Sequence, residues 1–121
     1  MSKKEKYFSK EFLREFDRLN ELNNEQNLKH KNQAMEIAKK IANLMKRDYA
    51  VQKVYLYGSL AYGDFSSMSD IDLFLVGFSG NYWRALSQAQ EIAGNIEVSL
   101  ACEEDCFVEL VEEVYEKGEE I

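Results

Sequence analysis

The residues best suited to chemistry lie in one stretch, residues 54–77. Gly58-Ser59 is followed, after ten residues, by Asp70-Ile71-Asp72 at the head of an apolar run. Because side chains alternate between the faces of a strand, Asp70 and Asp72 are expected on one face, about 7 Å apart along it. Two carboxylates at this spacing repel each other unless a cation lies between them. Their hard oxygen atoms suit Mg²⁺.

The Gly58-Ser59 pair adds a second function to this stretch. A strand that ends in such a turn offers backbone N–H groups and a hydroxyl, which together can hold a phosphate. Proteins bind Mg²⁺ through a few carboxylates together with the phosphates of a substrate. A phosphate-binding turn followed by a pair of metal-binding carboxylates therefore indicates nucleotide chemistry.

Other motifs built from similar residues do not fit this stretch. A Walker-type phosphate loop needs Lys after its second glycine, but Gly63 is followed by Asp64. A Rossmann fingerprint would need glycine at Leu60, and an EF-hand loop begun at Asp64 would need glycine at Ser69. The plain alternative is an Asp-rich turn before an edge strand. It is disfavoured because Asp is a poor strand residue, and two on one face need a reason.

The arrangement resembles the nucleotidyltransferase signature of the DNA polymerase β-like superfamily, in which Gly-Ser is followed after ten residues by Asp-x-Asp. The short chain and the sequence Ser69-Asp70-Ile71-Asp72-Leu73 are similar to those of the minimal nucleotidyltransferases. Residues 54–77 carry the motif, and the resemblance extends more weakly to the C-terminus. It implies the polymerase β-like fold, an α/β (α+β) architecture.

The resemblance also implies a role for each residue of the motif. Gly58, Ser59 and Ser69 would bind the nucleotide, the first two through its β- and γ-phosphates. Asp70 and Asp72 would hold two Mg²⁺ ions, which Mn²⁺ could replace. ATP is the donor that the family suggests. The expected activity is metal-dependent transfer of AMP to a hydroxyl acceptor, with release of pyrophosphate.

Glu97 is the candidate for a third carboxylate. Apolar residues alternate with polar or small ones over 96–101, which predicts a strand with Glu97 on its polar face. If that face continues the one bearing Asp70 and Asp72, three carboxylates converge on one metal site. The resemblance implies the same, because the family places a third acidic residue, usually Asp, in this strand. The alternative is a solvent-facing Glu on a half-exposed strand.

The turn departs from the family pattern in its charge. Minimal members often carry Arg between the two glycines, whereas Leu60 and Tyr62 stand there in this chain. Lys53 and Arg84 are the only basic residues between positions 49 and 116, so they are the candidates in that part for a phosphate contact.

Composition limits the partners of this chain. Residues 1–48 hold 12 Lys and Arg against 8 Asp and Glu, giving +4, while residues 49–121 hold 3 against 14, giving −11. A net charge of −7 does not favour general nucleic-acid binding. No apolar run is long enough for a membrane span, and no secretory signal pattern begins the chain. Cys102 and Cys106 lack partners for a zinc site and are expected as free thiols in a cytoplasmic protein.

The hydrophobic pattern predicts one domain over residues 1–121, with a helical N-terminal segment (1–48) and a catalytic core (51–121). The sheet is expected to be small and mixed, with about three strands packed against helices. The expected strands are 51–57, 70–76 and 96–101. The first two expected helices are an N-terminal one carrying Phe8, Phe12, Phe16, Leu19 and Leu22, and a second over 34–45 after a break at Asn23-Asn24. A third is expected over 81–93, ended by Gly94, and a last one is ended by Gly118, with Phe107, Leu110, Val111 and Val114 on one face.

The acceptor of the transferred group is not encoded in the motif. A domain this small has little room for an acceptor pocket, so a partner could bring the acceptor. Many proteins similar to this one are antitoxins paired with an HEPN-domain toxin, and some attach AMP to a tyrosine of that toxin. A binding module that neutralises its partner by contact alone is the alternative. The N-terminal aromatic stripe makes a second copy of this chain another candidate partner.

Overall fold

The structure, a computed structural model, describes residues 10–62 and 69–121, with side chains described from Leu28 onward. The helices are α2 (Lys10–Asp48), α3 (Ser59–Tyr62), α4 (Tyr82–Ala93) and α5 (Val108–Lys117), with a 3₁₀ turn η1 (Glu103–Asp105) before the last, and the strands are β1 (Lys53–Tyr57), β2 (Ile71–Val76), β3 (Val98–Cys102) and β4 (Glu119–Glu120). No helix in these ranges is long and apolar enough to cross a membrane.

The four strands form one mixed sheet in the order β3-β2-β1-β4. β2 pairs with β3 in parallel, whereas β1 pairs with both β2 and β4 in the antiparallel sense. The three predicted strands are present, and the α+β class is confirmed. The short fourth strand, at the β1 edge, was not predicted. Its two Glu residues show no apolar alternation, so their strand conformation depends on pairing with β1.

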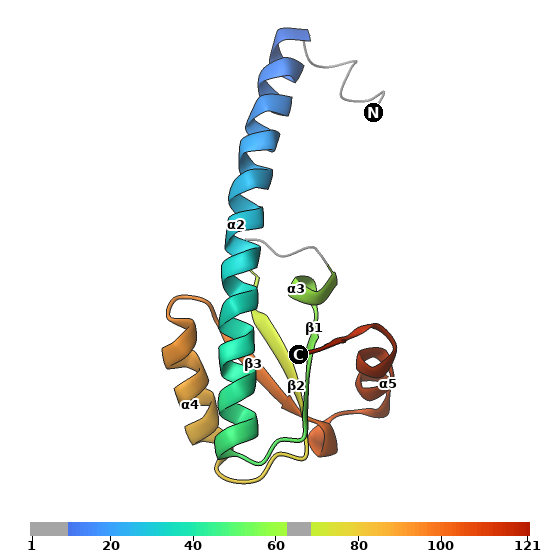
Figure 1. Cartoon of the computed structure of the whole chain (residues 1–121). Coiled ribbons are helices and arrows are strands. Elements are labelled where there is room, and N and C mark those ends of the chain that lie inside the picture. Colours follow the sequence, from blue (N-terminus) through green and yellow to red (C-terminus); the bar gives the residue numbers. More distant parts are fainter. Residues whose placement is uncertain (1–9, 63–68) are drawn as a thin grey trace.

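The helix α2 runs unbroken through Asn23-Asn24, so the predicted break there is wrong. An Asn in a helix costs at most about 0.7 kcal/mol relative to Ala, against about 3 kcal/mol for Pro. No Gly or Pro occurs in α2, and helix propagation from the turns on either side keeps the two Asn residues helical. The first part of α2 projects beyond the sheet (Figure 1). The aromatic stripe from Phe8 to Leu22 lies outside the residues whose side chains the structure describes.

One face of the sheet is covered by α2 and α4, which lie side by side across it (Figure 1). Small residues on α4 let this helix approach the sheet closely. The core between these layers contains Ala38, Ile41 and Met45 of α2, Ala85, Ala89 and Ala93 of α4, and Val54, Leu56, Ile71, Leu73, Leu75, Val98 and Leu100 of the strands. The helix predicted over 81–93 is confirmed, with Gly94 at its end in a left-handed conformation (φ +67°).

The opposite face of the sheet is partly covered by α5. The Tyr115 ring packs edge-on against Phe74 and Tyr55, with ring centroids 6.0 and 5.3 Å apart. Gly118 ends the helix as predicted, and its N–H donates to the Val114 carbonyl at 2.7 Å. Phe107 was predicted on the apolar face of this helix, but it precedes the first turn and is 85% exposed. That prediction is wrong because helical periodicity does not extend to a residue outside the helix.

Candidate functional site

The face of the sheet that α5 partly covers also bears Asp72, which lies beyond the rings of Tyr55, Phe74 and Tyr115. In the sheet, Asp72 lies opposite Tyr57 of β1 and beside Ser99 of β3. Its neighbours Ile71 and Leu73 are buried in the core, so the alternation of β2 directs Asp72 to the other face, where it is half-buried. Asp70 directly precedes β2 and is exposed.

Gly58 brings the predicted phosphate-binding turn against this carboxylate. It ends β1 in a left-handed conformation (φ +73°), and its carbonyl accepts a hydrogen bond from the Tyr62 N–H at 3.0 Å. A β-carbon at Gly58 would overlap Oδ2 of Asp72, so only glycine leaves room for the carboxylate in this position. The structure therefore places the Gly-Ser turn and the Asp-x-Asp strand in direct contact.

The two predicted serines flank this contact. Ser59 begins α3 directly after Gly58, and Ser69 directly precedes Asp70; both are half-buried. The rest of the turn, residues 63–68, lies outside the described residues. The structure therefore shows the two ends of the turn: Gly58 lies against Asp72 in space, and Ser69 precedes Asp70 in the chain.

The electrostatics of the site favour a cation. Burial raises the pKa of Asp72 above its ordinary value, and the charge of Asp70 raises it further. Burial also raises the pKa of Tyr57 to about 12, with the Asp72 charge acting in the same direction. Lys53 does not relieve this repulsion, because it lies opposite Val76 at the far end of β1. A metal ion between the carboxylates would relieve it.

Glu97 was predicted to lie within a strand over 96–101, but it lies just outside the observed strand. β3 begins at Val98, so Glu97 precedes it, and its side chain is exposed. Its carbonyl accepts the Ile71 N–H at 2.8 Å, which attaches this point of the chain to the beginning of β2. Because Ile71 pairs with Val98, Asp70 and Glu97 each stand one residue before that pair.

The predicted convergence of three carboxylates is not seen. Within the ranges that the structure describes, no three His, Cys, Asp or Glu side chains are grouped so that they could hold a metal. Asp72 on β2 and Asp70 directly before it remain as a pair whose charges interact, and Glu97 is exposed one residue before β3. A pair still fits Mg²⁺, which commonly takes one or two carboxylates and completes its shell with water and substrate phosphates.

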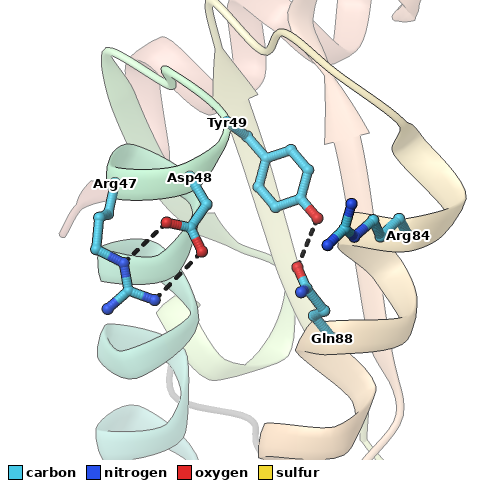
Figure 2. Close-up of a pocket in the computed structure, with 5 residues that line it drawn as sticks. All are labelled: Arg47, Asp48, Tyr49, Arg84 and Gln88. Carbon is cyan, nitrogen blue, oxygen red and sulfur yellow. Dashed lines mark hydrogen bonds and ion pairs between the residues drawn. The ribbon is translucent and has the colours of Figure 1, made fainter.

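Arg84 lines a different cavity, of about 380 Å³, between the end of α2 and α4 (Figure 2). There Arg47 pairs with Asp48 at 2.9 Å, and the Tyr49 hydroxyl donates to Gln88 at 2.5 Å. This cavity adjoins the beginning of β1, whereas the carboxylates lie at the end of that strand. Neither Lys53 nor Arg84 therefore takes the place of the arginine that the family often carries in its turn.

Three residues of this region were not predicted from the sequence. Tyr57 and Ser99 flank Asp72 in the sheet, and Gln90 of α4 binds the turn before β3. The position of Tyr57 directly before Gly58 was a signal that could have identified it. Ser99 lies two residues after Glu97, a spacing that places two side chains on the same face of a strand. Gln90 carries no sequence signal, because only the tertiary structure brings it to that turn.

Residues 39–121 match the family described as polymerase beta, nucleotidyltransferase. The chain belongs to this family. The match includes the Gly-Ser turn, both aspartates and Glu97. No curated protein matches the sequence significantly.

Two solved structures illustrate the fold. The chain is similar to one in a crystal structure of a mutant of the toxin-antitoxin MntA-HpeT, with 19% identity, a TM-score of 0.57, and coverage of 69% of this chain and 70% of that one. It is also similar to a chain in a crystal structure of a toxin-antitoxin with AMP-PNP, with 20% identity, a TM-score of 0.55, and coverage of 74% and 70%. At these identities the likeness shows the fold.

Proposed function

We propose that this protein is a metal-dependent nucleotidyltransferase that transfers AMP from ATP to a hydroxyl acceptor. The observation that carries this proposal is the contact between the Gly58 turn and Asp72, with Asp70 near enough for its charge to raise the pKa of Asp72. This contact brings the turn that we propose binds phosphate against one of the two carboxylates that we propose hold the metal. Membership of the polymerase beta nucleotidyltransferase family supports the same activity.

In the proposed reaction, the chain's own residues act mainly by position and charge. Backbone N–H groups of the Gly58-Ser59 turn and the Ser59 hydroxyl hold the terminal phosphates, while Asp70 and Asp72 hold Mg²⁺. Bound Mg²⁺ offsets the charge of the phosphates and makes the acceptor hydroxyl easier to deprotonate. The acceptor hydroxyl releases its proton to water and its oxygen bonds to the α-phosphorus, while the bond from that phosphorus to the bridging oxygen breaks and pyrophosphate leaves. Glu97 contributes a further carboxylate beside Asp70.

The acceptor that we propose is a hydroxyl of a partner protein, a tyrosine of an HEPN-type toxin. Two observations support a protein partner and a nucleotide donor. The fold is shared with a chain of the toxin-antitoxin MntA-HpeT and with a chain of a toxin-antitoxin bound to AMP-PNP. The resemblance to minimal nucleotidyltransferases supplies the tyrosine and the toxin class.

A second candidate function is that of an antitoxin that neutralises its partner by contact alone. The exposed position of Glu97 favours it, since among the described residues no three carboxylates gather into a metal group. The Glu in place of the family's usual Asp favours it too. The two functions differ in whether the carboxylates are needed.

The test compares the wild-type protein with Glu97→Ala, and with Glu91→Ala as a matched control on the exposed side of α4. Transfer of radiolabelled AMP is measured together with neutralisation of the toxin in cells. Loss of a metal ligand is expected to lower the transfer rate on the order of 10³-fold, with partner binding retained. Full neutralisation by Glu97→Ala would instead establish the contact mechanism. Glu91→Ala is expected to behave as wild type in both assays.

A further inference from the structure

We propose that Gln90 is a positioning residue that holds Glu97 beside the aspartate pair. This inference rests on the proposed function, because it assigns a task to Gln90 only if Glu97 contributes to the metal site. The side-chain amide of Gln90 makes three hydrogen bonds across the turn between α4 and β3. Its Nε2 donates to the carbonyls of Gly94 (3.2 Å) and Ile96 (2.7 Å), and its Oε1 accepts the Val98 N–H (3.2 Å).

These bonds hold Glu97 from both sides. The residue before it, Ile96, and the residue after it, Val98, are both bound by the same amide. A third restraint comes from β2, since the Ile71 N–H donates to the Glu97 carbonyl at 2.8 Å. The backbone of an exposed residue outside any strand is thus fixed at three successive positions.

The restraint sets the direction of the Glu97 side chain as well as its place. Val98 is buried in the core under the helices, so a chain held in extended form at Val98 directs the preceding residue to the opposite face. That face bears Asp72, and Asp70 directly precedes the strand that carries it. Paired strands lie about 4.8 Å apart, so a residue level with Asp70 on the neighbouring chain is within reach of it. If the turn loosened, Glu97 would lose this register, because it precedes the first pair of the β2–β3 ladder.

The experiment measures Mn²⁺ affinity of the whole protein by electron paramagnetic resonance, for wild type, Gln90→Met, Glu97→Gln and the double variant. Gln88→Met is the matched control, since Gln88 also lies on α4 but bonds to Tyr49 at the other cavity. We expect Gln90→Met to weaken Mn²⁺ binding about tenfold, as loss of an outer-shell partner does, and Glu97→Gln, which changes the proposed ligand itself, to weaken it at least as much. The double variant should bind Mn²⁺ no more weakly than Glu97→Gln alone, because Gln90 acts only through Glu97.

Amide hydrogen exchange without metal provides a second readout. Gln90→Met is expected to speed exchange of the Val98 and Ile71 amides, whereas Gln88→Met leaves it unchanged. Should Gln90→Met fail to fold, Gln90→Glu keeps the acceptor for Val98 and removes the two donors, and it is expected to give the same loss of Mn²⁺ affinity.

The outcomes distinguish failure of the role proposed for Gln90 from failure of the proposed function. If Glu97→Gln weakens Mn²⁺ binding but the Gln90 variants bind as wild type, the inference is overturned and the proposed function stands. Losses that add in the double variant also overturn it, since Gln90 would then act independently of Glu97. If Glu97→Gln leaves Mn²⁺ binding unchanged, the role of Glu97 in the proposed function fails, and the inference fails with it.

Discussion

Asp72 lies against the Gly58 backbone, and the charge of Asp70, directly before β2, acts on it. A half-buried carboxylate beside a second one is unfavourable in the metal-free protein, which the raised pKa of Asp72 reflects. Such an arrangement is common at functional sites, where the repulsion is relieved by the ligand. At the scale of residues, this repulsion is what the proposed metal ion would relieve.

The raised pKa of Asp72 predicts how pH acts on the site. Protons compete with the metal for this carboxylate, so Mn²⁺ affinity should begin to fall at a higher pH than an ordinary Asp would give. Metal-free stability should change in the opposite direction. The folded state binds this proton more tightly than the unfolded state, so the contribution of Asp72 to the free energy of unfolding rises as pH falls through its raised pKa.

Asp72→Asn tests both effects. It should abolish divalent-dependent ATP binding in calorimetry, and it should make the metal-free protein more stable at pH 7 in urea denaturation. Asp105→Asn, an exposed carboxylate of η1, is the control and should change neither. ATP binding by the wild-type protein that needs no divalent ion, or an unfolded Asp72→Asn protein, would contradict the assignment.

Gly58→Ala separates backbone strain from displacement of Asp72. Alanine in a left-handed conformation costs about 1–2 kcal/mol, and at this position its β-carbon must also push Asp72 away. Gly77→Ala is the matched control, because Gly77 has a similar φ (+82°) but faces only the flexible Gln52 side chain. Both variants should lose similar stability in urea, and only Gly58→Ala should lose divalent-dependent ATP binding. Equal ATP binding by the two would show that the contact with Asp72 is unimportant.

At the scale of elements, the end of α2 joins the helical layer to the sheet. The N–H groups of Tyr49 and Val51 both donate to the Met45 carbonyl, at 3.0 and 3.3 Å, which closes the last turn of the helix. Ala50 between them adopts a left-handed conformation (φ +54°), a position that usually carries glycine. The left-handed conformation of Ala50 ends the helix and turns the chain toward β1, which begins at Lys53.

Ala50→Gly should therefore stabilise the protein. Relief of the left-handed strain outweighs the greater freedom of glycine in the unfolded chain, and we expect about 1 kcal/mol and a rise of a few degrees in melting temperature. Lys39→Gly, at an exposed site inside α2, should lower stability by a similar amount. Thermal denaturation of the two variants measures both effects. A destabilised Ala50→Gly protein would show that the turn is not strained.

At the scale of the whole molecule, α2 has two parts. Among the side chains described from Leu28 onward, the buried positions of α2 begin at Ala34, and the first part of the helix projects beyond the sheet (Figure 1). The sequence of that part carries the stripe Phe12, Phe16 and Leu19. An apolar stripe on a projecting helix is typical of an interface with another chain.

Shortening the chain to begin at Gln26 tests this interpretation. The shortened protein should stay folded, because every described α2 residue of the core follows Gln26. Its molar mass by light scattering should be that of a monomer, whereas the full chain should form a larger assembly. A monomeric full chain that needs residues 1–25 only to stay folded would contradict the interface.

The sequence alone determined those features that depend on local spacing. The interval between Gly58 and Asp70, the alternation in β1 and β2, the period of α4 and the ends at Gly94 and Gly118 all follow from backbone geometry within a few residues. The family and the α+β class followed from them. Those features could be predicted because each is fixed by neighbours along the chain.

Only the tertiary structure decided the features that depend on distant partners. β4 is a strand because β1 offers it a pairing edge, and β3 begins at Val98 because Gln90 binds the turn before it. Glu97 precedes β3 and is exposed because of that turn. The contact of Gly58 with Asp72 arises from strand register. Register joins positions far apart in sequence, and no local pattern specifies which atoms it brings together.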